Sequence, residues 1–292
     1  HEIERILWEL SGLVAASAFT IVCDYKNITE LAFIFACAEL AYRMNACAPT
    51  ITEERRVELI RCRHPLIEQA VPVNILLGGE YSMLVITGPN TGGKTVALKT
   101  LGLFSLMAQA GLQLPCEQAS VCVFDAVFAD IGDEQSIEQS LSTFSSHMVG
   151  IVSILEQMTD QSLVLFDELG SGTDPVEGAA LATSILEEVL AAGAICAATT
   201  HYAELKAFAI EREGVCNASC EFDVETLRPT YRLMIGTPGK SNAFAISERL
   251  GISRQIIERA KGYVDHGSRS FEAVIEKMEA QRFALEAEKE KA

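Results

Sequence analysis

One eight-residue segment constrains this chain more than any other feature of its sequence. The segment Gly88–Thr95 reads GPNTGGKT and matches GxxxxGK[ST], the pattern of a phosphate-binding loop. An apolar run, Tyr81–Thr87, precedes it and predicts a buried strand, while Thr95–Ala110 predicts a helix. Such a strand, loop and helix in this order is the context that the motif requires. A chance match in a chain of this length has odds of roughly one in a hundred, given ordinary residue frequencies.

The residue types in this segment account for its chemistry. Glycines let the backbone turn tightly, so that successive N–H groups point at phosphate oxygens, and the positive end of a helix dipole lies behind them. Lys94 is expected to reach the β- and γ-phosphates, and the hydroxyl of Thr95 to bind Mg²⁺. The predicted nucleotide-binding residues are Gly88, Pro89, Asn90, Thr91, Gly92, Gly93, Lys94, Thr95 and Val96.

A second apolar strand ends in two carboxylates. Leu163–Phe166 is followed at once by Asp167 and Glu168. Asp167 would hold Mg²⁺ directly or through water, whereas Glu168 points elsewhere and could polarise an attacking water molecule. Strands often end in acidic residues, so the pair alone is ambiguous. Downstream of a phosphate loop, it predicts nucleotide hydrolysis.

A histidine follows a third predicted strand, Ala194–Thr199. Open α/β sheets bind ligands at the carboxyl ends of their strands, so we interpret His201 as a sensor of the γ-phosphate. A lone histidine is more often structural, and His64 and His147 have weaker claims to a role. The candidate catalytic residues are therefore Lys94, Glu168 and His201.

The order of predicted elements indicates an α/β fold with a mostly parallel sheet flanked by helices. The pair Phe222–Val224 and Tyr231–Ile235 predicts a small antiparallel part, and two long helices precede the strands, the second from about Thr29 to Ala46. We expect three regions: a helical remnant at 1–60, a nucleotide-binding domain at 61–264, and a stub at 265–292. The stub could begin a coiled coil or be a plain solvated helix.

Composition narrows the partners of the chain. Its 23 Lys and Arg against 40 Asp and Glu give a net charge of −17, which argues against a large nucleic-acid footprint. Nine cysteines without a CxxC pair predict free thiols in a reducing cytoplasm. The longest apolar runs, Leu13–Cys23 and Ala191–Thr200, are too short to span a bilayer. Because the sequence opens and closes in mid-pattern, we expect it to be part of a longer protein.

Four motifs together resemble one family. The segments GPNTGGKT, LSTFSSHM at 141–148, LVLFDELGSGTD at 163–174 and ATTHYAEL at 198–205 occur in the order and spacing of the ATPase domain of MutS proteins. MutS proteins belong to the ABC-type ATPases, and the resemblance covers about Arg61 to Gly262. Two further segments, GSGTDPVEG at 170–178 and GTPGKSNAFAISERLGI at 236–252, resemble the MutS-two branch rather than the mismatch-repair proteins.

The resemblance implies an ABC-type P-loop NTPase that binds ATP and Mg²⁺ and hydrolyses ATP. Ser142 with Thr143 matches the family's signature segment, which caps the γ-phosphate on the opposite subunit; from the residues alone, an ordinary helix cap would be favoured. A homodimer with two composite ATP sites is therefore implied, with Asp174 near the interface. Where the family commonly has an aromatic residue against adenine, this chain has Val73 and its neighbours.

Three functions follow as expectations. The first is an ATP-driven dimeric switch that acts on DNA to suppress recombination, or on stalled ribosomes, through parts of the protein outside this chain. The second is mismatch repair proper, with recognition of mispaired DNA. The third is a dimerisation module that binds nucleotide without turnover, against which Glu168 argues. Any nuclease activity is expected outside the chain, because the sequence shows no carboxylate or histidine cluster beyond the ATP motifs.

Overall fold

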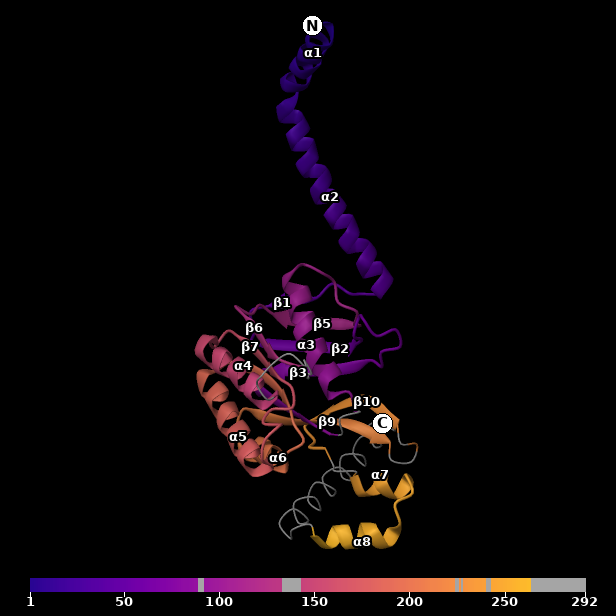
Figure 1. Cartoon of the computed structure of the whole chain (residues 1–292), viewed down its shortest axis with the longest axis vertical. Coiled ribbons are helices and arrows are strands. Elements are labelled where there is room, and N and C mark those ends of the chain that lie inside the picture. Colours follow the sequence, from indigo (N-terminus) through magenta and orange to yellow (C-terminus); the bar gives the residue numbers. More distant parts are fainter. Residues whose placement is uncertain (89–91, 133–142, 224–225, 227, 240–242, 264–292) are drawn as a thin grey trace. The chain divides into compact units, whose positions relative to one another are not determined.

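The structure, a computed structural model, describes residues 1–88, 92–132, 143–223, 226, 228–239 and 243–263. It divides into two compact units, His1–Ala46 and Cys47–Ala292 (Figure 1). The predicted stub at 265–292 lies outside the described residues. No disulfide joins any of the nine cysteines, all of which lie in the described part.

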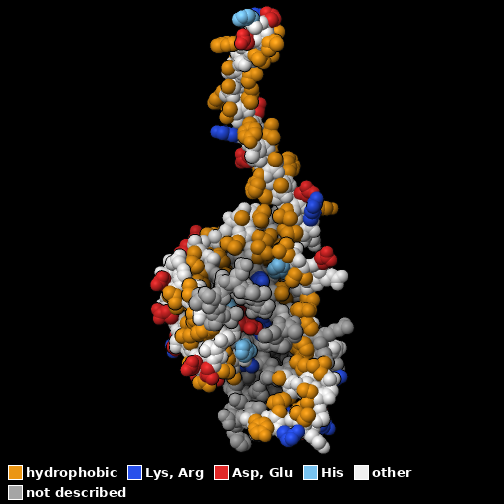
Figure 2. Space-filling view, in the orientation of Figure 1, with side chains coloured by type: hydrophobic (Ala, Val, Ile, Leu, Met, Phe, Trp, Pro, Cys, Tyr) orange, Lys and Arg blue, Asp and Glu red, His pale blue; other side chains and the backbone are white. Residues whose placement is uncertain are grey.

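The first unit consists of two helices, α1 (Glu2–Ala16) and α2 (Ala18–Met44). The second helix begins well before the predicted Thr29, because the β-branched residues in Thr20–Val22 lower helix propensity without breaking the helix. Both helices expose many hydrophobic side chains (Figure 2); Trp8 of α1 and Phe19 of α2 are each 83% exposed. No single described helix is long and apolar enough to span a membrane. Taken together across their 63° bend, α1 and α2 have the length and apolar composition of a membrane span.

The second unit is built around a six-stranded sheet that confirms the predicted α/β fold. The strand order is β10-β9-β4-β8-β7-β6, and every neighbouring pair is parallel except β9 and β10. In chain order the strands are β4 (Met83–Thr87), β6 (Val127–Asp130), β7 (Leu163–Phe166), β8 (Ile195–Thr199), β9 (Val215–Asp223) and β10 (Arg228–Ile235). The antiparallel part is thus a hairpin at one edge of the sheet.

Helices cover both faces of this sheet because strand side chains alternate between the faces. Val164 and Phe166 of β7 belong to a buried apolar cluster shared with three helices on one face, whereas Leu165 approaches Gly102 of α3 on the other. The helices are α3 (Lys94–Gln109), α4 (Thr143–Gln157), α5 (Pro175–Ala192) and α6 (Ala203–Glu211). Two further helices, α7 (Ala243–Arg249) and α8 (Arg254–Tyr263), follow the hairpin.

A second, four-stranded sheet was not predicted from the sequence. Its order is β1-β5-β2-β3, with β1 (Thr50–Thr52), β2 (Arg56–Cys62), β3 (Val73–Gly78) and β5 (Gln118–Cys122). Although β5 and β6 follow one another closely along the chain, they lie in different sheets. The side chain of Gln109 fixes the turn between them by hydrogen bonds to both the N–H and the C=O of Phe124.

The N-terminus of α5 offers a test of this local structure. The Asp174 carboxylate accepts hydrogen bonds from the N–H groups of Val176 and Glu177, at 3.0 and 3.2 Å, and caps the helix before Pro175. We expect Asp174→Ala to lower the free energy of unfolding by about 1 kcal/mol, because two N–H groups lose their acceptor. Asp174→Asn, which keeps a capping oxygen, should stay near the parent in denaturant unfolding. Equal stability of all three proteins would contradict this role.

Candidate nucleotide-binding and catalytic site

The phosphate loop connects β4 to α3, as the motif predicts. Gly88 has φ +130° and Gly93 has φ +93°, backbone conformations that residues with a Cβ rarely adopt. A Cβ on Gly88 would also lie 3.1 Å from the carbonyl oxygen of Cys220. Both ends of the loop therefore need glycine. Pro89, Asn90 and Thr91 lie outside the described residues, and Gly92 is buried.

Lys94 is the first residue of α3, and its side chain is almost fully buried at 1% exposure. Its Nζ atom donates a hydrogen bond to the carbonyl oxygen of Gly88 at 2.7 Å. Burial lowers the pKa of Lys94, although the nearby Glu168 and Asp167 partly oppose this shift. A buried ammonium group that turns back onto its own loop is well suited to an anionic ligand such as a phosphate.

Asp167 lies directly beyond β7 and meets two hydroxyl groups. The hydroxyl of Thr95 donates to its Oδ2 atom at 2.8 Å, and the hydroxyl of Thr199 donates to its Oδ1 atom. Thus α3, β7 and β8 each contribute one residue to the same point at the carboxyl edge of the sheet.

The donor set at this point fits Mg²⁺. Carboxylate and hydroxyl oxygens are the ligands that this ion prefers, and it commonly takes its remaining ligands from substrate phosphates and water. Within the part of the chain that the structure describes, no three His, Cys, Asp or Glu side chains come together to hold a metal ion. A site made of Asp167, Thr95 and a nucleotide does not require such a cluster.

Glu168 has an unusual backbone conformation, with φ +49° in the left-handed region. Its N–H donates to the hydroxyl of Thr199 at 2.8 Å. The side chain lines a polar cavity of about 360 Å³ beside the phosphate loop. The cavity is lined by Thr95, Lys99, Gly132, His147, Asp167, Glu168 and Ser171.

Of the candidate histidines, His147 lines the polar cavity and His201 does not, which reverses the order expected from the sequence. His147, which had a weaker claim, lines the polar cavity, and its Nδ1 atom is 2.8 Å from a carboxylate oxygen of Asp130. His201 follows β8 as predicted, but it is exposed and is not among the residues that line the cavity. Its ring packs on Tyr202, with the centroids 4.5 Å apart. Ser142 lies outside the described residues, and Thr143 begins α4.

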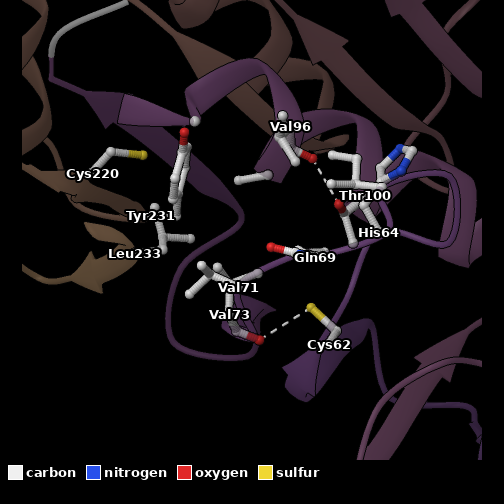
Figure 3. A pocket seen from close by; sticks show the side chains of 14 residues that line it. Cys62, His64, Gln69, Val71, Val73, Val96, Thr100, Cys220, Tyr231 and Leu233 are labelled. Atoms are coloured by element: carbon white, nitrogen blue, oxygen red, sulfur yellow. Dashed lines mark hydrogen bonds between the residues drawn. The ribbon is translucent and has the colours of Figure 1, made fainter. Parts of the chain in front are cut away.

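A second cavity, of about 270 Å³, lies at the end of the phosphate loop, where Gly93 and Val96 line it, and is mostly apolar. Val71 and Val73 line it from the segment after β2, and the predicted nucleotide-binding residue Val96 lines it from α3 (Figure 3). The size and apolar lining suit a flat heterocyclic base. Further lining residues include Cys62, His64, Gln69, Thr100, Cys220 and Leu233.

Tyr231 of β10 supplies this pocket with the aromatic ring that the sequence analysis did not find. Its ring lies across the pocket from His64 (Figure 3). A Cβ added to Gly93 would lie 3.0 Å from Tyr231 Cδ1, so the ring packs on the end of the phosphate loop. In the sequence this ring is separated from Val73 by more than a hundred residues, and its available signal is an aromatic residue in the predicted hairpin. Tyr231 also has φ +59°, a further mark of a constrained position.

Comparisons with known proteins confirm the family resemblance of the sequence. A family model described as MutS domain V matches residues 84–266. Proteins named "Endonuclease MutS2" are similar to the chain: that of Brevibacillus brevis is 56% identical over 285 residues, and that of Clostridioides difficile 52% over 295 residues. These alignments cover 97% and 100% of the chain, but only 36% and 37% of the respective relatives. The chain therefore spans little more than a third of the length of the curated relatives it matches.

Tyr231 gives a direct test of the apolar pocket. We expect Tyr231→Ala to weaken binding of a fluorescent ATP analogue by about tenfold, because stacking of a base on an aromatic ring is worth about 1–3 kcal/mol. Tyr231→Phe keeps the ring and should bind like the parent. If the alanine variant bound the analogue as tightly as the phenylalanine variant, the base would not lie against this ring.

Proposed function

Because the chain belongs to the MutS family and carries the ATPase domain of that family, we propose that it is the ATP-hydrolysing switch of a dimeric protein that acts on DNA or on ribosomes. The observation that carries the proposal is that Asp167 and Glu168 line one polar cavity together with Thr95 of the phosphate loop. The neighbouring Lys94 of the same loop is buried and close enough to both acids for their charges to raise its pKa against the effect of burial. We further propose that the ATPase domain extends to about residue 264 and that the helical remnant is His1–Ala46 rather than the expected 1–60, because β1 and most of β2 lie between residues 47 and 60 and belong to the second unit. The finer assignments below rest on the same geometry.

We propose separate roles for the residues at the loop. Lys94 exchanges the carbonyl oxygen of Gly88 for the β- and γ-phosphates, whose negative charge favours its buried ammonium group. Thr95 and Asp167 hold Mg²⁺, which when bound offsets phosphate charge and orients the γ-phosphate. Val96 and Tyr231 bound the pocket for the adenine ring.

Glu168 acts in this proposal as the group that polarises the attacking water. Glu168 lines the cavity together with Asp167. The carboxylate of Asp167 is already held by the hydroxyl groups of Thr95 and Thr199, so we assign the two acids different partners. His201 follows the adjacent strand and serves as the γ-phosphate sensor. Because His201 is exposed and does not line the polar cavity, this role requires its side chain to move towards the γ-phosphate when the nucleotide binds.

We also propose a homodimer with composite ATP sites. In this arrangement Ser142 and Thr143 of the partner subunit cap the γ-phosphate, and Asp174 lies near the interface. The loop that follows Glu168 supports the proposal, because Gly170 and Gly172 both have φ near +85°, at +83° and +86°. Gly170 is buried against Gly178, whereas Gly172 and Asp174 are exposed, and the loop leads directly into the capped N-terminus of α5.

The substrate of the whole protein is a further proposal. The relatives carry the name endonuclease, so nucleic acid is the class of partner that their name gives. The chain itself, with a net charge of −17, has little surplus positive charge with which to bind the phosphate backbone of a nucleic acid. We propose that contacts with DNA, in recombination suppression, or with stalled ribosomes come from other parts of a cytoplasmic protein, as would any nuclease activity.

Glu168→Gln tests the catalytic assignment. We expect the turnover number to fall by about a hundredfold or more, since loss of a general base typically costs 10²–10⁴-fold. Binding of ATP should stay within about threefold of the parent, because the substituted residue does not hold the phosphates. Phosphate release and fluorescent-nucleotide titration measure the two quantities. Glu188→Gln on the exposed face of α5 is the matched control and should match the parent.

Retention of the parent rate by Glu168→Gln would overturn the assignment of the base. A parent chain that binds ATP but never hydrolyses it would instead favour the dimerisation module.

The charge of the chain gives a second prediction. We expect the 292-residue chain to bind Mg·ATP but to bind duplex DNA weakly, because neutralising several phosphates requires clustered Lys and Arg. A gel-shift titration at physiological salt should show no discrete complex at concentrations where the nucleotide site is saturated. A tight complex formed by this chain alone would contradict the placement of the DNA contacts elsewhere.

A further inference from the structure

Thr199 joins the two acidic residues of the site through a single hydroxyl group. It is the last residue of β8, and its side chain is fully buried. The hydroxyl donates its hydrogen to Oδ1 of Asp167 and accepts the N–H of Glu168 at 2.8 Å. The carbonyl oxygen of Thr199 also accepts the N–H of Leu169 at 3.1 Å. The chain turn that carries both acids is therefore hydrogen-bonded to one residue of the neighbouring strand.

The chemistry of a hydroxyl group allows both bonds at once. It has one hydrogen to donate and two lone pairs to accept, so Asp167 and Glu168 do not compete for it. A valine at this position would fill the same space and favour a strand equally well, but it could make neither bond. The polar residue in an otherwise apolar strand, whose other members are Ile195, Cys196, Ala197 and Ala198, thus has a specific consequence at the site.

Each bond fixes a different feature of the acidic pair. Since Thr199 is bonded to Oδ1 of Asp167, the carboxylate is oriented with Oδ2 at the hydroxyl of Thr95, 2.8 Å away. The second bond satisfies the N–H of Glu168, which has φ +49°. A non-glycine residue in this conformation persists only when its surroundings hold it there.

We propose that Thr199 is a positioning residue for ATP hydrolysis, because its hydroxyl orients Asp167 towards Thr95 and holds the left-handed turn that directs Glu168 into the cavity. This inference rests on the proposed function for its effect on turnover. The hydrogen-bond geometry that it invokes belongs to the chain alone, without nucleotide, and can be measured separately.

The experiment compares Thr199→Val, which removes the hydroxyl at nearly constant volume, with Thr199→Ser, which keeps it. Amide hydrogen exchange of Glu168 in the nucleotide-free chain is the first readout, because its N–H loses a buried acceptor only in the valine variant. We expect the valine variant to exchange this amide about tenfold faster or more, and the serine variant to stay near the parent.

Turnover and its Mg²⁺ requirement are the second readout. The valine variant should lose about tenfold or more in kcat and need a several-fold higher Mg²⁺ concentration for half-maximal rate, while the serine variant recovers most of both. Thr183→Val is the matched control, since among the described residues the hydroxyl of Thr183 bonds only to the carbonyl of Ala179 within α5. This control should match the parent in all three measurements.

The outcomes separate this inference from the proposed function. Unchanged Glu168 exchange and unchanged kcat in a folded Thr199→Val protein would overturn the positioning role, as would a serine variant as impaired as the valine variant. If the valine variant does not fold, Thr199→Ala makes the same test. A parent chain without ATPase activity would contradict the proposed function, whereas the exchange of the Glu168 amide would still decide whether Thr199 holds the turn.

Discussion

The site depends on the carboxylate of Asp167, which two hydroxyl groups hold from opposite sides. Thr95 brings the start of α3 to one oxygen, and Thr199 brings the end of β8 to the other. The phosphate loop, the acidic strand end and the neighbouring strand therefore meet at one group. Parallel strands make this possible, because their carboxyl ends lie at the same edge of the sheet. The apolar β7 beneath it is fully buried and gives the carboxylate a rigid support.

Charge is distributed so that a nucleotide completes the site. Burial lowers the pKa of Lys94, and the nearby acids only partly offset that effect, so an anionic ligand would gain from the buried ammonium group. Asp167 and Glu168 both line the polar cavity, where a divalent cation would relieve the repulsion between their carboxylates. Although the chain as a whole has a net charge of −17, the phosphate loop contributes the positive charge of Lys94 beside these acids, an arrangement that suits ATP and Mg²⁺ together.

Several residues of the site could be predicted because the chemistry depends on local spacing. The phosphate loop needs its glycines, Lys94 and Thr95 within a few positions, and Asp167 must follow an apolar strand directly. His147 had only a weaker claim from the sequence, and Tyr231 was not predicted at all, because each reaches the site through packing. His147 reaches the site from α4, which packs against β6. Tyr231 reaches it from the hairpin, and its ring packs against Gly93. Neither contact leaves a pattern in the spacing of residues.

The sequence by itself determined the α/β fold, the nucleotide loop and the acidic strand end, because these follow from hydrophobic periodicity and from motifs contained in short segments. Only the tertiary structure decided that β5 and β6 belong to different sheets, that an aromatic ring closes the apolar pocket, and that Thr199 serves both acids. Strand partners and side-chain contacts are set by which elements pack together across the whole unit, and that choice is made by the summed burial of many residues rather than by any local one.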